Sequence, residues 1–226
     1  MRTAYCLLLL AAAVPAVGQT FPFVEDFDAD AANWRQNASA NVLGHVAGGG
    51  PAGAGDAYAS YDFDLATFTS PFGGPIVFRG QAGLGSSGGA FAGDWIAAGV
   101  NQVTAMVRHN ASVALPFSGR FAAPANSPGA STEELLVPPG VWTQIAFDIS
   151  PSTPYVGSGD YSTFSDIGNI QFGVSIPAGT TAAALGVVTF DLDRVSITAV
   201  PEPASAALLA LAGCCGCWLT RRRRVG

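Results

Sequence analysis

The sequence predicts an all-β protein, a two-sheet antiparallel β-sandwich of the jelly-roll type, placed between two end segments that serve export. Apolar and polar residues alternate with period two in several stretches, which is the pattern of strands with one buried face. The 28 Gly and 15 Pro residues interrupt the chain between these stretches, and the body shows neither helical periodicity nor a repeat of fixed length. Strands spaced at roughly 8–15 residues favour a sandwich or jelly roll over a propeller or barrel.

The strand pattern is clearest in the second half of the chain. Residues 141–148 alternate throughout, and residues 170–176 do the same. Near the end, residues 188–192 place their apolar members on one face, until the phase slips before Val195. Such a slip predicts a β-bulge or bend within that strand.

One domain is expected between the two ends, over residues 19–200. Its five Arg are outnumbered by fifteen Asp and Glu, so it carries a charge of about −10, although the whole chain carries −6. The sequence contains no Lys. An acidic domain of this kind repels phosphate backbones, which excludes nucleic acid as a partner.

All four cysteines lie in the end segments, at Cys6, Cys214, Cys215 and Cys217. The domain can therefore form neither disulfides nor thiolate metal sites, and it must fold on its hydrophobic core alone. Cys214 and Cys217 have the spacing of a redox motif, but their apolar surroundings indicate small residues of a membrane helix instead.

The N-terminus, residues 1–18, predicts a secretory signal helix that is removed on export. A single positive charge precedes the apolar run 6–14, which is too short to span a bilayer. Small residues at Ala16 and Gly18 suit the pocket of signal peptidase, so we expect the cut before Gln19.

The C-terminal segment, residues 201–226, predicts a single transmembrane helix with a cytoplasmic arginine cluster. Residues 204–220 are uncharged, and as a helix they rise roughly 26 Å, enough to cross a hydrocarbon core. Positive charge at the end of the helix places that end in the cytoplasm and the domain outside. The motif residues of this tail are Pro201, Glu202, Pro203, Arg221, Arg222, Arg223 and Arg224.

This tail closely resembles the PEP-CTERM sorting signal, through its ordered series of Pro-Glu-Pro, apolar helix and arginine cluster. The resemblance implies recognition by an exosortase-type transpeptidase and removal of the tail. It also implies transient attachment to the inner membrane, followed by delivery of the domain to the bacterial cell surface or the extracellular exopolysaccharide matrix. A plain single-pass anchor that is never cut is the alternative.

The domain itself resembles a galactose-binding-like jelly roll, an architecture that many carbohydrate-binding modules share. The resemblance is carried by four spaced segments, 23–28, 91–96, 142–148 and 190–195, in which aromatic and acidic residues recur. These positions are degenerate, and fold analogy alone does not establish sugar binding.

The same resemblance implies a structural calcium ion that links the first strand to the last. The matching residues are Glu25 and Asp191, with Asp26 and Asp193 as neighbours. Carboxylate and carbonyl oxygens are the ligands that calcium takes. The alternative is that these acids form a solvated face that alternates with buried apolar residues.

Sugar binding calls for an exposed aromatic plane beside polar side chains, because apolar sugar faces stack on rings while hydroxyls form directed hydrogen bonds. Trp95 beside Asp94 in a Gly-rich loop is the first candidate, and Tyr155 and Tyr161 around Asp160 are the second. Core packing of Trp95 remains the alternative. The tryptophans Trp34 and Trp142 are expected in the core.

Catalysis finds little support in the sequence. His45 and His109 are the only histidines, and neither a G-x-S-x-G nor an H-E-x-x-H motif occurs. Paired carboxylates for glycoside hydrolysis remain open, because the fold sets their separation. The sequence therefore predicts an exported, non-enzymatic surface or matrix protein whose domain interacts with, or is embedded in, extracellular polysaccharide. A structural or adhesive protein without a sugar site is the alternative, and a secreted glycan-active enzyme is a third possibility.

Overall fold

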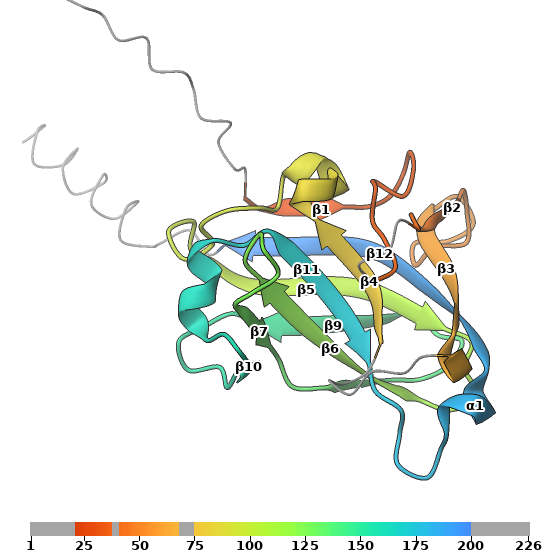
Figure 1. Ribbon diagram of the computed structural model, residues 1–226. Helices are drawn as coiled ribbons and strands as arrows, with labels where there is room; N and C mark the ends of the chain where they lie inside the picture. Colours follow the sequence, from red (N-terminus) through yellow and green to blue (C-terminus); the bar gives the residue numbers. More distant parts are fainter. Residues whose placement is uncertain (1–20, 38–40, 68–74, 200–226) are drawn as a thin grey trace, which may run out of the picture.

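The computed structural model describes residues 21–37, 41–67 and 75–199, which form a sandwich of two antiparallel sheets. Figure 1 shows the strands of one sheet lying across those of the other. Each sheet has six strands. The predicted fold class, an antiparallel β-sandwich of the jelly-roll type, is confirmed.

The first sheet, called sheet A here, is centred on the long last strand. Its order is β2 (Gly44–Val46), β3 (Tyr58–Asp64), β12 (Val187–Ala199), β5 (Val100–His109) and β9 (Thr143–Asp148), with β1 (Phe23–Glu25) paired to β12. β1 and β3 follow one another along β12, since β3 pairs with its first half and β1 with its second.

The second sheet, sheet B, packs against the inner face of sheet A. Its order is β10 (Val156–Gly157), β7 (Gly129–Ser131), β6 (Leu115–Ala122), β11 (Asn169–Val174) and β4 (Ile76–Gln81), with β8 (Leu135–Val137) paired to β6. Short helical turns join the strands: η1 (Leu65–Thr67), η2 (Ala82–Leu84), η3 (Ser86–Gly89), η4 (Tyr161–Ser165) and α1 (Ala182–Leu185).

The core lies between the sheets and is rich in aromatic rings. Phe117 of β6 contacts Phe190 of β12, and Phe147 of β9 stacks on Phe172 of β11. Burying one such side chain contributes about 1.5–3 kcal/mol. Because successive side chains of a strand point to opposite faces, every second residue faces this core, and the residues between them form the two outer faces of the sandwich.

The last strand contains the irregularity that the sequence predicts. The register between β12 and β5 shifts between Asp193 and Ser196, and Arg194 has a φ of 49°. A β-bulge inserts an extra residue into one strand, so the alternation of inward and outward side chains shifts by one position. Val195 and Ile197 consequently return to the core after it.

The two predicted export segments lie outside the described residues. These are the signal 1–18 and the tail 201–226, with its motif residues and its helix over 204–220. In the part of the chain that the structure does describe, no helix has the length and apolar character needed to cross a membrane. Signal, tail and sorting stay predictions.

Candidate functional site

Trp95, the first predicted sugar contact, lies in the core. Its side chain is 0% exposed, and its Nε1 donates a hydrogen bond to the carbonyl of Phe91 at 2.7 Å. The indole packs on Phe121 and Phe164. The expectation of an exposed stacking plane at Trp95 is therefore wrong, and the alternative of core packing is confirmed.

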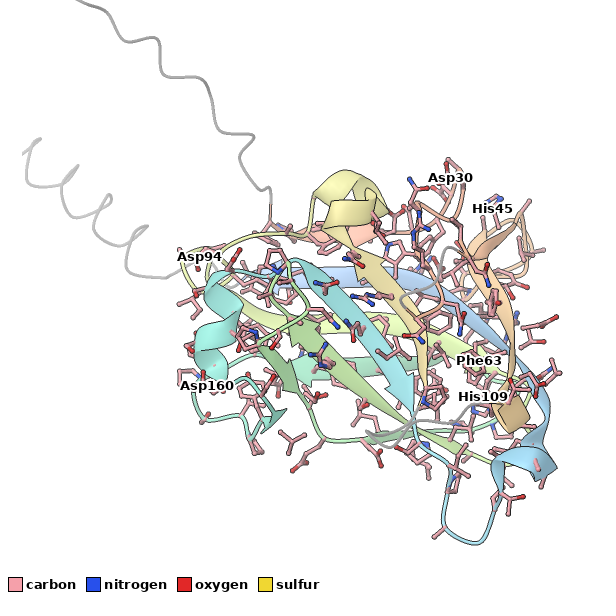
Figure 2. All side chains as sticks on the ribbon, in the orientation of Figure 1. Asp30, His45, Phe63, Asp94, His109 and Asp160 are labelled. Atoms are coloured by element: carbon pink, nitrogen blue, oxygen red, sulfur yellow. The ribbon has the colours of Figure 1, made fainter. Side chains whose placement is uncertain are left out.

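The two tyrosines of the second predicted sugar site contact Phe164, the ring on which Trp95 also packs. Tyr155 and Tyr161 both pack on Phe164, with ring centroids 5.3 and 6.1 Å away. Asp94 and Asp160 lie at this end of the sandwich (Figure 2), where each accepts a hydrogen bond from a nearby backbone N–H. The structure thus brings the predicted residues together at one end of the domain, with the two tyrosines partly buried and the two aspartates exposed.

The expected calcium ligands are not brought together. Glu25 lies opposite Val195 on β12, four residues from Asp191 and hence about 13 Å along the strand at about 3.3 Å per residue. One oxygen of Glu25 accepts the N–H of Phe27, while Asp191 pairs with Arg108. Among the described residues no group of three or more metal-ligating side chains is placed to hold an ion. The residues present do not fit the implied site.

A pocket of about 550 Å³ opens instead on the outer face of sheet A. Carboxylates come to it from the segment after β1 and from the loop before β3, while β5, β9 and the β12 bulge supply its other walls. We call this pocket the sheet A groove. Its principal lining residues are Asp26, Asp28, Asp56, Met106, Gln144 and Arg194.

A part-exposed aromatic cluster lies on the same face of the sheet. The rings of Tyr58 and Trp142 meet edge to face at 5.3 Å between centroids. The guanidinium of Arg108 lies over both rings, 5.2 Å from the centroid of Tyr58 and 4.6 Å from that of Trp142. Cation–π contacts of this kind hold the rings in fixed orientations.

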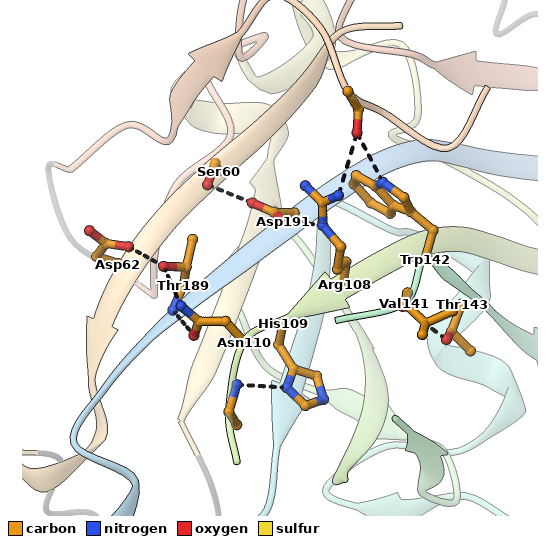
Figure 3. Close-up of polar contacts among 12 residues, drawn as sticks. Ser60, Asp62, Arg108, His109, Asn110, Val141, Trp142, Thr143, Thr189 and Asp191 are labelled. Atoms are coloured by element: carbon orange, nitrogen blue, oxygen red, sulfur yellow. Dashed lines mark hydrogen bonds and ion pairs between the residues drawn. The ribbon is translucent and has the colours of Figure 1, made fainter. Parts of the chain in front are cut away.

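Hydrogen bonds fix the cluster to the sheet and to the groove (Figure 3). Arg108 Nε donates to Asp191 Oδ2 at 2.8 Å, and Ser60 Oγ donates to Asp191 Oδ1 at 2.7 Å. Trp142 Nε1 donates to the carbonyl of Gly49 at 3.2 Å. The loop that carries Gly49 also carries Asp56 into the groove, so the cluster and the groove share one loop.

Trp142 is the functional candidate that the sequence-based assignment missed. We expected it in the core because its neighbours in sequence are apolar, and that expectation is wrong. Alternation in residues 141–148 places Trp142 in phase with Gln144, which is exposed, and out of phase with the buried Ile145. The period-two pattern itself was therefore the signal that could have found this residue.

A buried carboxyl group lies beneath the groove. Asp193 is 0% exposed, and its Oδ1 accepts the N–H of Arg194 at 2.7 Å. Burial raises the pKa of Asp193 to about 7, and the nearby charges of Asp56 and Asp26 act in the same direction. Asp193 therefore retains its proton in part at neutral pH.

This arrangement does not support glycoside hydrolysis. The general acid of such an enzyme must reach the glycosidic oxygen. Burial raises the pKa of Asp193 into the range of a general acid, but Asp193 is fully buried and does not line the groove. The carboxylates that do line the groove, such as Asp26 and Asp56, are suited to accept hydrogen bonds from a ligand.

Comparison with known proteins finds likeness in fold alone. No protein-family model matches the chain, and no curated protein sequence matches it significantly. An exo-β-agarase structure superposes with a TM-score of 0.50 at 12% identity, over 78% of this chain and 25% of the agarase. The CBM22-2 xylan-binding domain of Paenibacillus barcinonensis Xyn10C gives 0.47 at 17% identity, over 79% of this chain and 99% of that one.

A third structure contains a similar module within a larger protein. The CBM22-1 and GH10 modules of Clostridium thermocellum xylanase 10B, complexed with xylohexaose, give a TM-score of 0.47 at 13% identity. The match covers 79% of this chain and 28% of the xylanase chain, so our chain spans about a quarter of the two enzymes that it resembles here. At 12% identity the superposition on the agarase structure shows likeness in fold and does not extend to activity.

Proposed function

We propose that this protein is an exported, non-enzymatic protein that binds a carbohydrate on the outer face of sheet A. The observation that carries the proposal is the part-exposed pair Tyr58 and Trp142, fixed by Arg108 on the face that also holds a 550 Å³ groove. Carbohydrate sites combine aromatic rings with directed hydrogen-bonding groups in this way. The proposal rests on this surface, because jelly rolls serve many unrelated functions.

The lining of the groove favours a neutral, hydroxyl-rich ligand. Asp26, Asp28 and Asp56 offer carboxylate oxygens that accept hydrogen bonds from hydroxyl groups, and Gln144 offers both a donor and an acceptor. Three carboxylates in one groove repel an anionic ligand. The ligand class that fits is therefore a neutral polysaccharide or oligosaccharide.

Export is proposed from the two end segments. The signal over 1–18 and the sorting tail over 201–226 would release the domain at the cell surface or into the exopolysaccharide matrix after an exosortase-type enzyme removes the tail. Mass spectrometry of the surface fraction should find peptides that end near Pro201–Pro203 and lack the terminal arginines. Intact chains that retain those arginines in the surface-associated membrane would contradict cleavage.

Binding is tested with Trp142→Ala on neutral glycan arrays and affinity gels. We expect at least a tenfold loss of affinity, because the change removes a ring together with its buried area. Val141→Ala is the matched control, since Val141 is the exposed neighbour and 56% exposed. Unchanged binding by Trp142→Ala would refute this site. Failure of the native protein to bind any neutral glycan would refute the function and favour a structural or adhesive role.

A further inference from the structure

The outer face of sheet B carries three arginines in one cross-strand row. Arg35 forms a bridge with Arg79 of β4, Arg79 lies opposite Gln171 of β11, and Gln171 lies opposite Arg120 of β6. Residues directly opposite one another project from the same face of a sheet. We call Arg79, Gln171 and Arg120, with Arg35 beside them, the arginine row. It holds three of the five arginines of the domain.

Among the described residues, the hydrogen-bond partners of Arg79 and Arg120 are all neutral groups. Arg79 Nη2 donates to Asn169 Oδ1 at 3.0 Å, and its Nε is buried without a hydrogen-bond partner. Arg120 donates to the side chain and carbonyl of Asn126 at 2.8 Å each and to Gln171 Oε1 at 3.1 Å. In the part of the chain that the structure describes, neither guanidinium forms an ion pair.

This placement is unfavourable without an anion. Arg79 is only 4% exposed, and burial lowers the pKa of both Arg79 and Arg120, with the charge of Arg120 lowering that of Arg79 further. Two like charges on one face repel, and removing a charge from water is unfavourable unless a counter-charge compensates. A bound carboxylate would compensate both guanidinium groups.

The row is nevertheless held in a fixed geometry. Asn126 Oδ1 accepts from both Arg120 and Gln171, so the loop after β6 is fastened to the row. Gly129 on β7 lies against the Arg120 guanidinium, where a Cβ atom would collide with it. A preorganised guanidinium fork loses little entropy when it binds a carboxylate with two parallel hydrogen bonds.

The outer face of sheet B beside the row offers no aromatic anchor on its three central strands. At the neighbouring position Gly173 lies opposite Ser118 on one side and Ile76 on the other, so two small residues and one part-exposed aliphatic residue form the floor there. The aromatic residues of β4, β6 and β11 face the core, and these three fully described strands place none on the outer face. Protein interfaces are usually anchored by aromatic or other large apolar side chains. A chain of flat sugar rings suits this surface better.

We propose that the arginine row is a second binding site, which takes the carboxylate groups of an acidic polysaccharide. It lies on the opposite face of the sandwich from the sheet A groove, and it does not depend on ligand binding there. The part-exposed Arg120 forms hydrogen bonds to the uronate carboxylates, and Arg79, which is only 4% exposed, adds its charge from behind. Ser118 and Gly173, with Ile76 beside them, receive the sugar ring.

The probe is an oligogalacturonate, measured by isothermal titration calorimetry against a neutral galacto-oligosaccharide of equal length. We expect the oligogalacturonate to bind the Trp142→Ala variant, whose sheet A site is removed, at least tenfold more tightly than the neutral chain binds it, and salt to weaken the binding. Arg79→Gln should reduce that affinity at least tenfold. Absence of oligogalacturonate binding overturns the proposal, and so does equal affinity for polyglutamate, which would indicate a site for acidic polypeptides.

Gln171→Glu is a second variant, in which a loss of binding cannot be attributed to misfolding. It places a carboxylate between Arg79 and Arg120, and so it should raise the melting temperature while it abolishes oligogalacturonate binding. Gln102→Glu is the matched control, because it adds the same charge on sheet A, where Gln102 faces Asp148. The control should leave oligogalacturonate binding unchanged. Wild-type affinity in Gln171→Glu overturns the proposal, and loss of neutral-glycan binding by Trp142→Ala tests sheet A separately.

Discussion

The arginines on the two outer faces of the sandwich have different partners. On sheet A, Arg108 pairs with Asp191 at 2.8 Å, and Arg194 lies between Asp56 and Asp193 at 3.7 and 3.8 Å. On sheet B, Arg79 and Arg120 lie among amide groups and have no carboxylate partner in the described structure. On sheet A the two arginines are therefore paired with carboxylates of the domain, whereas on sheet B the counter-charge is the anionic ligand that we propose.

This difference has a physical consequence for ligand choice. A face with internal ion pairs and spare carboxylates presents hydrogen-bond acceptors to hydroxyl groups and repels anions. A face with recessed guanidinium groups favours anions, even though the domain as a whole carries about −10. In the functions proposed above, local charge placement rather than net charge is therefore what distinguishes the glycan class of the two sheets.

The largest expected effect comes from breaking the internal pair of sheet A. Asp191→Ala leaves the guanidinium of Arg108 without its carboxylate, and removing one partner of a largely buried pair costs about 3 kcal/mol. For a domain of this size that lowers the melting temperature by roughly 10 °C. Asp62→Ala on β3 is the control, because Asp62 is exposed and accepts a hydrogen bond from the Thr189 hydroxyl rather than pairing with Arg108. Equal melting of the two variants would show that Arg108 needs no internal counter-ion.

A smaller effect is expected at Asp193, and its sign depends on pH. The folded-state pKa of about 7 lies above the unfolded value of 3.8, so the stability that the protonated carboxyl group gives is complete below about pH 4 and is lost as pH rises through about 7. Asp193→Asn should match the native protein near pH 4 and exceed it at pH 8.

We expect that gain at pH 8 to be about 2 kcal/mol in urea unfolding. The full shift would correspond to roughly 4 kcal/mol at about 1.4 kcal/mol per pKa unit, and water in the neighbouring groove screens part of it. Asp62→Asn, which alters an exposed carboxylate, should show no comparable gain. If the free energy of unfolding of Asp193→Asn depended on pH as that of the native protein does, ionisation of the buried Asp193 would not destabilise the fold.

The fold was predictable because alternation is a local property. The strands over 141–148 and 170–176 and the β12 bulge before Val195 all follow from period-two patterns in the sequence. The same pattern places Trp142 outward, but the apolar character of its neighbours led to the wrong assignment. Trp95 could not be assigned in this way, since the chain around it is irregular and its burial depends on Phe121 and Phe164.

The arginine row could not be predicted, because it depends on register between distant strands. Arg79 and Arg120 come together only through their common neighbour Gln171, and a shift of one residue in either pairing would turn one side chain into the core. No local sequence pattern predicts the register of β4 and β6 with β11. The same limitation applies to the expected calcium site, which assumed that the acids of the first and last strands would meet.

Calcium provides the smallest expected effect. Since Glu25 and Asp191 lie about four residues apart along β12 and Asp191 is already paired with Arg108, millimolar calcium should leave the melting temperature within about 1 °C of its value in chelator. Differential scanning calorimetry with and without calcium measures this directly. A rise of several degrees that Asp191→Ala abolishes would restore the implied site, and it would mean that Arg108 gives up its carboxylate to the ion. Sheet A would then also depend on an external charge, and the contrast between the two faces would fail.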